Sequence, residues 1–163
     1  MKKYKSDFFG EIDLEKDEDY YDVEYKYENR IIELDLNIYL EEKPRIEQLI
    51  QIDNIIKNLS SLEKEIRKFI DSDFEADGIS KEYVEFYTDE FEEYELDSLV
   101  DKENKEKTIE EQLLSKIYIR RIGFYPNDNQ FAVFDFHVNH EISDQILVVI
   151  IENDMSYDIR WES

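Results

Sequence analysis

The chain has 163 residues, of which 43 are acidic and 20 basic, and its formal net charge is −23. It contains no cysteine, which excludes disulfides, thiolate metal sites and cysteine nucleophiles. Twelve Tyr, ten Phe and one Trp provide apolar surface that acidic disordered chains lack, so we expect one folded domain over residues 1–163.

The negative charge also restricts the partners. Phosphate groups repel it, which disfavours binding to nucleic acid or to anionic lipid. The longest apolar run, Ile146 to Ile151, is too short to cross a bilayer, and no apolar stretch of signal-peptide length follows the N-terminal lysines. The sequence therefore predicts a cytoplasmic protein without nucleic-acid or membrane partners, for which a basic protein is the electrostatic complement.

Alternation of apolar and polar residues predicts a hairpin near the N-terminus. From Tyr21 to Tyr27, and again from Ile32 to Leu40, every second residue is apolar, which is the period of a half-buried strand. Asn29 between the two runs tolerates the positive φ of a tight turn. A shorter strand is expected at Phe8 to Ile12.

The central part of the chain has the spacing of helices. Pro44 suits the first turn of an amphipathic helix that extends to about Ser72, and two helices hinged at Ser60-Ser61 are the alternative. Asp73 to Ile79 breaks this pattern. Ser80 is then expected to cap a second helix, whose aromatic residues share one side.

After this second helix, the polar and aperiodic segment Tyr94 to Lys107 is expected to be a loop. Thr108 and Glu111 have the spacing of a capping box, which opens a short helix. Four strands should follow, and the middle two, apolar on both faces, should be central in the sheet. Their expected bounds are Ile117 to Tyr125, Gln130 to Val138, Gln145 to Glu152 and Ser156 to Trp161.

This segregation of strands from helices predicts an α+β fold. We expect an antiparallel sheet that combines the N-terminal hairpin with a C-terminal four-strand meander. Two or three helices should pack on one face of this sheet. No internal repeat and no Gly, Pro or Ser-rich linker divides the chain.

Motifs for catalysis are largely missing. With three glycines in the chain, neither a dinucleotide-binding fingerprint nor a phosphate-binding loop can be written, and no Gly-x-Ser-x-Gly elbow occurs. The sequence therefore identifies no catalytic residue, metal ligand or cofactor, and a non-enzymatic role is favoured.

A pair of histidines is the first weak candidate for a metal site. His137 and His140, with Asp135 on the same strand, have side chains that transition metals bind. Residues three apart in a strand face opposite sides, so chelation requires His140 to lie in the turn. The alternative interpretation is that both histidines face solvent near a strand end.

A second weak candidate is Asp73 to Gly78, which resembles the first half of an EF-hand loop. The pattern then fails, because Val84 occupies the position of the bidentate Glu. The alternative interpretation is an ordinary helix end, a turn and a helix cap. Calcium binding is a hypothesis that a calcium-dependent rise in melting temperature would support.

The segment Glu82 to Asp97 combines acids with aromatic residues and contains no base. Carboxylates with aromatic side chains among them suit a basic protein surface, because the rings stack on Arg and the charges speed association. The alternative is a helix that buries its rings and solvates its acids. The candidate partner-binding residues are Glu82, Tyr83, Glu85, Phe86, Asp89, Glu90, Glu92, Glu93, Glu95 and Asp97. A second acidic stretch runs from Glu11 to Asp22.

Several strand-like blocks resemble a bacterial family known only as domain of unknown function two thousand and four. These blocks are Phe9 to Leu14, Arg30 to Asn37, Arg121 to Pro126, Phe131 to Phe136, Leu147 to Val149 and Trp161 to Ser163. The resemblance spans nearly the whole chain and implies one domain. It implies no catalytic residue and no ligand.

Two functional hypotheses from different classes follow. The leading one is a non-enzymatic binding module whose acidic and aromatic face docks on a basic partner, for example an immunity-type inhibitor of a toxin. The other is a small metal-dependent hydrolase that uses Asp135, His137 and His140. A dimer joined through exposed aromatic residues is a third possibility.

Overall fold

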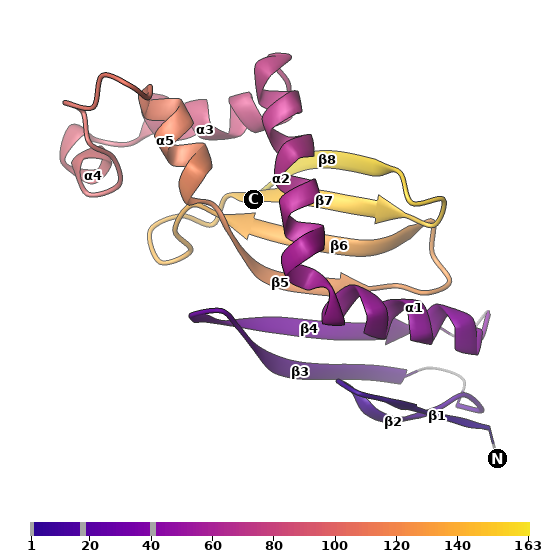
Figure 1. Ribbon diagram of the computed structural model, residues 1–163. Coiled ribbons are helices and arrows are strands. Elements are labelled where there is room, and N and C mark those ends of the chain that lie inside the picture. Colours follow the sequence, from indigo (N-terminus) through magenta and orange to yellow (C-terminus); the bar gives the residue numbers. More distant parts are fainter. Residues whose placement is uncertain (1, 17–18, 40–41) are drawn as a thin grey trace.

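The computed structural model describes residues 2–16, 19–39 and 42–163 (Figure 1). Within these residues the chain forms five helices and eight strands, which confirms the α+β fold and exceeds the two or three helices expected. The elements are β1 (Lys3–Ser6), β2 (Gly10–Asp13), β3 (Asp19–Tyr27), β4 (Arg30–Ile38), α1 (Ile46–Lys57), α2 (Leu59–Glu75), α3 (Ile79–Glu90), α4 (Glu93–Asp97), α5 (Ile109–Lys116), β5 (Tyr118–Phe124), β6 (Gln130–His137), β7 (Ile146–Glu152) and β8 (Tyr157–Glu162).

The main sheet has six strands in the order β3-β4-β5-β6-β7-β8, and β1 pairs with β2 in a separate hairpin. All neighbouring strands are antiparallel except β4 and β5, which are parallel. The prediction of a purely antiparallel sheet is therefore wrong at this one pair. The reason is that all the helices lie between β4 and β5, and such a long crossover lets the chain return in the same direction.

The N-terminus differs from the expected strand at Phe8 to Ile12. Phe8 lies in the turn that joins β1 to β2, and Gly10 opens β2 with a φ of +77°. That left-handed conformation suits glycine. The turn directs its aromatic side chains toward the core, where the Phe8 ring packs 5.5 Å from that of Tyr25 and the Phe9 ring 6.4 Å from that of Phe124, between centroids.

The predicted hairpin is confirmed as β3 and β4, with Tyr27 opposite Arg30 at the turn. The positive φ falls on Glu28, at 54°, and not on Asn29 as expected. Leu40, the expected last residue of this hairpin, lies outside the described residues.

Helices α1 and α2 cross one face of the sheet (Figure 1). Of the two alternatives, the pair of helices is confirmed, but the chain bends at Asn58, two residues before the expected hinge at Ser60-Ser61. Pro44 precedes α1 and does not lie in its first turn as expected; Arg45 is the N-cap residue, and its backbone N–H donates to the Gln48 side chain. The buried residues of the two helices share the 3.6-residue period that the sequence showed. They include Leu49, Ile52, Ile56, Leu59, Ile66 and Ile70.

A buried carboxylate fastens the N-terminal hairpin to α1. Asp53 is 3% exposed and accepts hydrogen bonds from the Tyr4 hydroxyl (2.7 Å) and the Ser6 hydroxyl (2.6 Å). It also accepts one from the backbone N–H of Asp7. Because all these donors belong to the first strand and its turn, Asp53 holds β1 in place even though no strand of the main sheet pairs with it among the described residues.

The junction of α2 and α3 depends on another carboxylate. The Asp73 side chain accepts hydrogen bonds from both the backbone N–H and the hydroxyl of Ser80, each at 2.7 Å. Gly78, and not Ser80 as expected, is the N-cap of α3. The side chain that satisfies the backbone N–H of Ser80, in the first turn of α3, therefore comes from the preceding helix.

Helices α3, α4 and α5 lie together at one end of the molecule (Figure 1), and α3 packs against β8. Aromatic rings join α3 to β8, since Trp161 packs against both Tyr83 and Phe86. The capping box of Thr108 and Glu111 is confirmed at the start of α5. Among the described residues, no helix is both long and apolar enough to cross a membrane.

We predict that Gly78→Ala destabilises the protein by about 2 kcal/mol, because a Cβ at this position would lie 2.2 Å from Oδ1 of Asp73. The hydrogen bonds from Ser80 prevent the carboxylate from moving aside. In an Asp73→Ala background the same change should have less than about half this effect. Urea unfolding of the four proteins measures the coupling, and equal effects in the two backgrounds would contradict this account.

Candidate functional site

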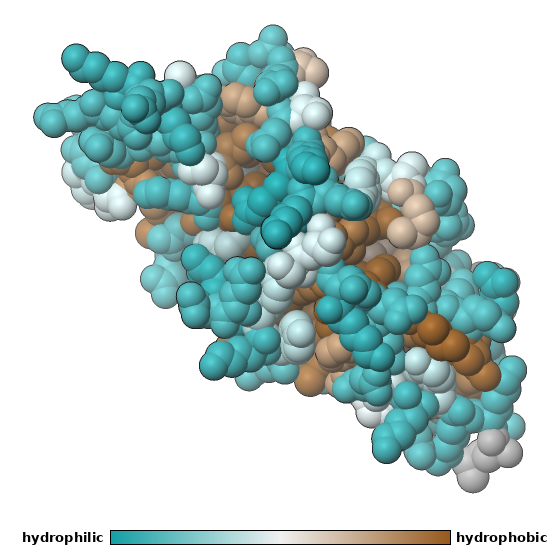
Figure 2. Space-filling model, viewed as in Figure 1, coloured by the Kyte–Doolittle hydropathy of each residue, from teal (hydrophilic) through white to brown (hydrophobic). Residues whose placement is uncertain are grey.

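The acids between Glu82 and Asp97 lie on α3, on α4 and in the turn between them, and we call this set of residues the α3–α4 acidic surface. It consists of Glu82, Glu85, Asp89, Glu90, Glu92, Glu93, Glu95 and Asp97. All of these residues are exposed or half-buried, and figure 2 shows this end of the molecule as mainly hydrophilic, with hydrophobic side chains visible beneath the outer layer. The segment Tyr94 to Lys107 was expected to be a loop, but α4 occupies its beginning, because Glu92 and Glu95 form a capping box.

The aromatic residues of this segment divide into buried and exposed ones. Tyr83 is fully buried, and its hydroxyl donates to the carbonyl of Gln145 and accepts from the N–H of Val138, so this residue is not available to a partner as the sequence suggested. Burial, together with the neighbouring Tyr87, raises the pKa of the Tyr83 hydroxyl. Phe86 is half-buried against Trp161. Both therefore serve mainly to hold α3 on the sheet.

Tyr94 is the aromatic residue that the acidic surface presents to solvent, and its exposed fraction is 74%. It follows Glu93 in α4 and lies between acids on both sides in the sequence. Tyr94 lies within the acidic and aromatic segment that the sequence indicated, but it was not among the candidate partner-binding residues. An aromatic side chain at this exposure has no role in the core.

Basic residues neutralise only part of the α3–α4 acidic surface. Lys81 lies near Asp77 (2.5 Å) and Glu85 (4.0 Å), and Lys102 pairs with Glu93 (3.0 Å) and Asp97 (2.9 Å). Within the described parts of the chain, the remaining exposed carboxylates of this surface form no ion pair. They are Glu82, Asp89, Glu90 and Glu92.

The two acidic stretches of the sequence do not share a face. The stretch from Glu11 to Asp22 contains β2 and the start of β3, which lie at the opposite end of the molecule from α3 and α4 (Figure 1). Asp17 and Glu18 of this stretch lie outside the described residues. The sheet order agrees, because β3 is one edge strand and β8, which contacts α3, is the other.

The weak EF-hand resemblance has a structural explanation. The side chain of Asp73, the first residue of the pattern, accepts hydrogen bonds from Ser80, and Asp77 forms an ion pair with Lys81. Across residues 2–16, 19–39 and 42–163, no group of three or more His, Asp or Glu side chains is placed to hold a metal ion.

The candidate metal residues Asp135, His137 and His140 have different neighbours. Asp135 faces Arg121, with 3.4 Å between Oδ2 and Nη1. His140 lies in the turn after β6, as chelation would require, but its Nδ1 shares a hydrogen bond with the Tyr118 hydroxyl. The His137 and His140 ring centroids are 6.3 Å apart. Asp135 and His140 are thus each engaged by another residue, and the structure does not bring the three together.

His137 is 6% exposed, and its Nδ1 is buried with no hydrogen-bond partner. Burial lowers the pKa of His137 to about 4, and the neighbouring Arg120 and His140 act in the same direction. The imidazole is therefore neutral at physiological pH. This state fits a packing role under Tyr118 and His140, whose rings contact it.

A cross-strand ion network occupies the helix-free face of the sheet. Arg121 on β5 lies between Asp35 on β4 and Asp135 on β6, with its Nε 2.6 Å from Asp35 Oδ2. Its side chain passes over Gly123, where a Cβ would be 2.6 Å from the guanidinium, and reaches the Tyr125 hydroxyl at 3.0 Å. Burial raises the pKa of Asp135, and Arg121 opposes this shift. The network joins the parallel pair to the meander.

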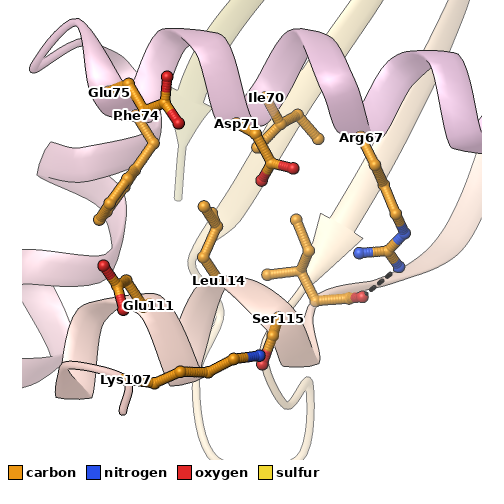
Figure 3. Close-up of a pocket in the computed structure, with 10 residues that line it drawn as sticks. Arg67, Ile70, Asp71, Phe74, Glu75, Lys107, Glu111, Leu114 and Ser115 are labelled. Carbon is orange, nitrogen blue, oxygen red and sulfur yellow. Dashed lines mark hydrogen bonds between the residues drawn. The ribbon is translucent and has the colours of Figure 1, made fainter.

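A groove of about 570 Å³ separates α2 from α5 (Figure 3). Ile70, Phe74 and Leu114 supply its apolar lining, and the Asp71 carboxylate points into the space between the helices. At one end the Arg67 guanidinium donates a hydrogen bond to the carbonyl of Ile117. Acids and bases both line the groove, so its charge favours neither a cationic nor an anionic ligand.

We predict that Arg121→Met lowers the free energy of unfolding by about 3 kcal/mol, because it leaves the Asp35 carboxylate buried and unpaired. The triple variant Arg121→Met, Asp35→Asn, Asp135→Asn should recover most of this loss, since neither carboxylate is then left without its counter-ion. Chemical unfolding at neutral pH measures both. A single variant as stable as the parent protein would show that the network contributes nothing.

We predict that His137 makes the protein acid-sensitive. The folded state keeps this imidazole neutral below its usual pKa of 6.5, whereas the unfolded state takes up a proton. The associated stability is fully present above pH 6.5 and is lost as the pH falls toward about 4. Relative to His137→Phe, the parent protein should lose roughly 1–2 kcal/mol between pH 7 and pH 5. Parallel stability curves for the two proteins would contradict the prediction.

Comparison with known proteins finds no matching family model, curated protein or solved structure. The resemblance to the bacterial family of unknown function stays a prediction. The functional argument therefore depends on the surface and on its charges.

Proposed function

We propose that this protein is a non-enzymatic, acidic binding module of the cytoplasm whose α3–α4 acidic surface docks on a basic partner protein. An immunity-type inhibitor, which covers the basic substrate-binding surface of a toxin, is one concrete form. The observation that carries the proposal is the part of this surface that no base neutralises. Glu82, Asp89, Glu90 and Glu92 are exposed and form no ion pair among the described residues, and Tyr94 of the same segment is exposed.

The energetics of charge support this reading. A net charge of −23 destabilises a compact state through self-repulsion, and solubility alone requires a far smaller charge. A basic partner relieves the repulsion on binding. Electrostatic attraction of this kind mainly raises the association rate and selects partners by the sign of their charge.

The underlying architecture supports a preorganised surface. Tyr83 and Tyr87 are fully buried, and their rings fix α3 against β8 through Trp161. The acids therefore lie on a helix that is held by the core, which limits the entropy lost on binding. Tyr94 adds an exposed ring that is able to stack on an Arg guanidinium.

The same charge argues against other classes of partner. The four unpaired carboxylates would repel nucleic-acid phosphates and anionic lipid headgroups. The groove between α2 and α5 has mixed charge and gives no comparable reason to expect a small charged ligand.

The first experiment is a pull-down from lysate of the source cell at low and at high salt, with identification of the retained proteins. A basic protein that is retained at low salt and weakened at high salt would be taken forward as the purified partner. If no basic protein is retained at either salt concentration, the proposal is contradicted.

We predict that reversal of four charges, with Lys in place of Glu82, Asp89, Glu90 and Glu92, slows association with that partner by roughly 10- to 100-fold at low salt. The fold should survive, because these side chains are exposed and form no ion pair among the described residues, and Glu92→Lys removes only the capping box of the five-residue helix α4. Stopped-flow or surface-based kinetics measures the association rate.

The control variant places Lys at four exposed acids outside α3 and α4, namely Glu47, Glu103, Glu141 and Glu162. It changes the net charge by the same amount and should change the association rate much less. Equal slowing by the two variants would show that only the total charge matters, and the α3–α4 acidic surface would lose its role.

A further inference from the structure

The outer edge of β3 carries backbone groups that no strand satisfies. β3 is nine residues long and is the end strand of the sheet, and among the described residues it pairs only with β4. A two-residue turn makes Tyr27 and Arg30 the closing pair. In such a ladder alternate residues direct their backbone groups away from the partner strand, and here these are Tyr20, Asp22, Glu24 and Lys26. The N–H of Tyr20 accordingly donates to the Asp19 side chain.

On the helix side of the sheet, the β1–β2 hairpin covers only part of the apolar row of β3, since Phe8 packs on Tyr25 and the Asp13 N–H donates to the Tyr21 hydroxyl. Tyr21, Val23 and Tyr25 are half-buried, although their cross-strand partners Leu36, Leu34 and Ile32 are fully buried. The outermost strand of a sheet lacks a neighbour on one side, so its apolar side chains keep part of their surface in water. A further strand would remove this surface from water and stabilise the complex.

On the helix-free side, β3 places like charges opposite like charges. Asp22 lies opposite Asp35, and Glu24 lies opposite Glu33, in adjacent positions of the same face. Carboxylates in direct cross-strand register destabilise a hairpin. Arg121 compensates Asp35 alone of these four, and the other three form no ion pair within the described residues.

We propose that the outer edge of β3 binds an extended basic segment of a partner protein, which adds to the sheet as a seventh strand. Lys or Arg at alternate positions of that segment lies beside Asp22 and Glu24 and relieves the repulsion between the carboxylates. The residues between them are apolar and pack against Val23 and Tyr25. Backbone hydrogen bonds provide affinity, and the alternation provides specificity.

The net charge disfavours a second copy of this chain as the occupant, although Lys26 on the same face would offset part of the repulsion between two β3 edges. Two β3 edges in contact would add Asp22 and Glu24 of one copy to those of the other, in a protein of net charge −23. Charged side chains on an edge strand prevent pairing with another strand of the same charge. The same acids attract a basic strand.

This inference goes beyond the α3–α4 acidic surface, because β3 and β8 are the two opposite edges of the sheet and α3 lies against β8. The two proposals can fail independently. A protein with reversed charges at Glu82, Asp89, Glu90 and Glu92 should bind a strand at β3 with affinity close to that of the parent protein.

The test uses two blocked synthetic peptides. The first alternates Lys and Val over seven residues, and the second has proline in place of the central Val, so that its charge is equal but its ability to pair as a strand is lost. Fluorescence anisotropy should show at least about tenfold tighter binding of the alternating peptide, which corresponds to about 1.4 kcal/mol. Equal affinity for the two peptides would overturn strand addition.

Two variants of the same residue separate backbone from charge. Glu24→Pro removes an outward N–H, and Glu24→Gln removes the same charge while it keeps that N–H. The edge position makes proline tolerable, which thermal unfolding verifies. We expect Glu24→Gln to weaken the binding of both peptides by a few-fold and to keep the preference for the alternating peptide. Glu24→Pro should abolish this preference. Equal behaviour of the two variants would overturn the proposal.

Amide hydrogen exchange of the parent protein gives a readout that does not depend on any variant. The alternating peptide should protect the amides of Asp22, Glu24 and Lys26, and the proline peptide should not. Lack of protection at these amides would overturn the proposal. A dimer in light scattering without peptide, with the same amides protected from exchange, would also overturn it, because a second copy would then occupy the edge of β3.

Discussion

The sheet depends on the contact between β4 and β5, where the N-terminal hairpin meets the C-terminal meander. These strands pair in parallel over a short register, from Glu33 with Arg121 to Leu36 with Phe124. Arg121 strengthens this contact because it joins Asp35 on β4 to Asp135 on β6 across the middle of the sheet. Without this contact the chain would form a two-strand and a four-strand sheet, each with an additional open edge, and an isolated hairpin such as β3–β4 is at best marginally stable in water.

Joining the two halves fixes the positions of the acidic surfaces. Because β3 and β8 become the two outer strands, the aromatic contacts of Trp161 hold α3 at one edge, and the free backbone groups of β3 lie at the other. The acids on α3 and α4 and those on β3 are thus separated by the width of the sheet. Self-repulsion falls with this separation, since charges further apart than about a Debye length of 8–10 Å are largely screened.

Periodicity in the sequence predicts local structure well here and predicts long-range pairing poorly. The alternation from Tyr21 to Tyr27 and the capping box of Thr108 and Glu111 depend on neighbouring residues, and both predictions are confirmed. The parallel pairing of β4 and β5 depends on residues about 90 positions apart, as with Glu33 and Arg121, and no local pattern encodes it. The role of Asp53 was also missed, because a single carboxylate in a helix gives no signal that its partners are Tyr4 and Ser6.

The candidate site shows the same limit at the level of single side chains. The pattern of α3 correctly indicated an amphipathic helix, but it did not separate Tyr83, which is buried, from Tyr94, which is exposed. That distinction depends on β8 and on the loop after β6, which enclose Tyr83 and leave Tyr94 outside. The positions of the bases follow the same principle: Lys81, Lys102 and Arg121 neutralise particular carboxylates. The net charge of the sequence indicates only which sign of charge a complementary partner would carry. The ion pairs of the individual carboxylates distinguish acids that stabilise the fold from acids that no base neutralises.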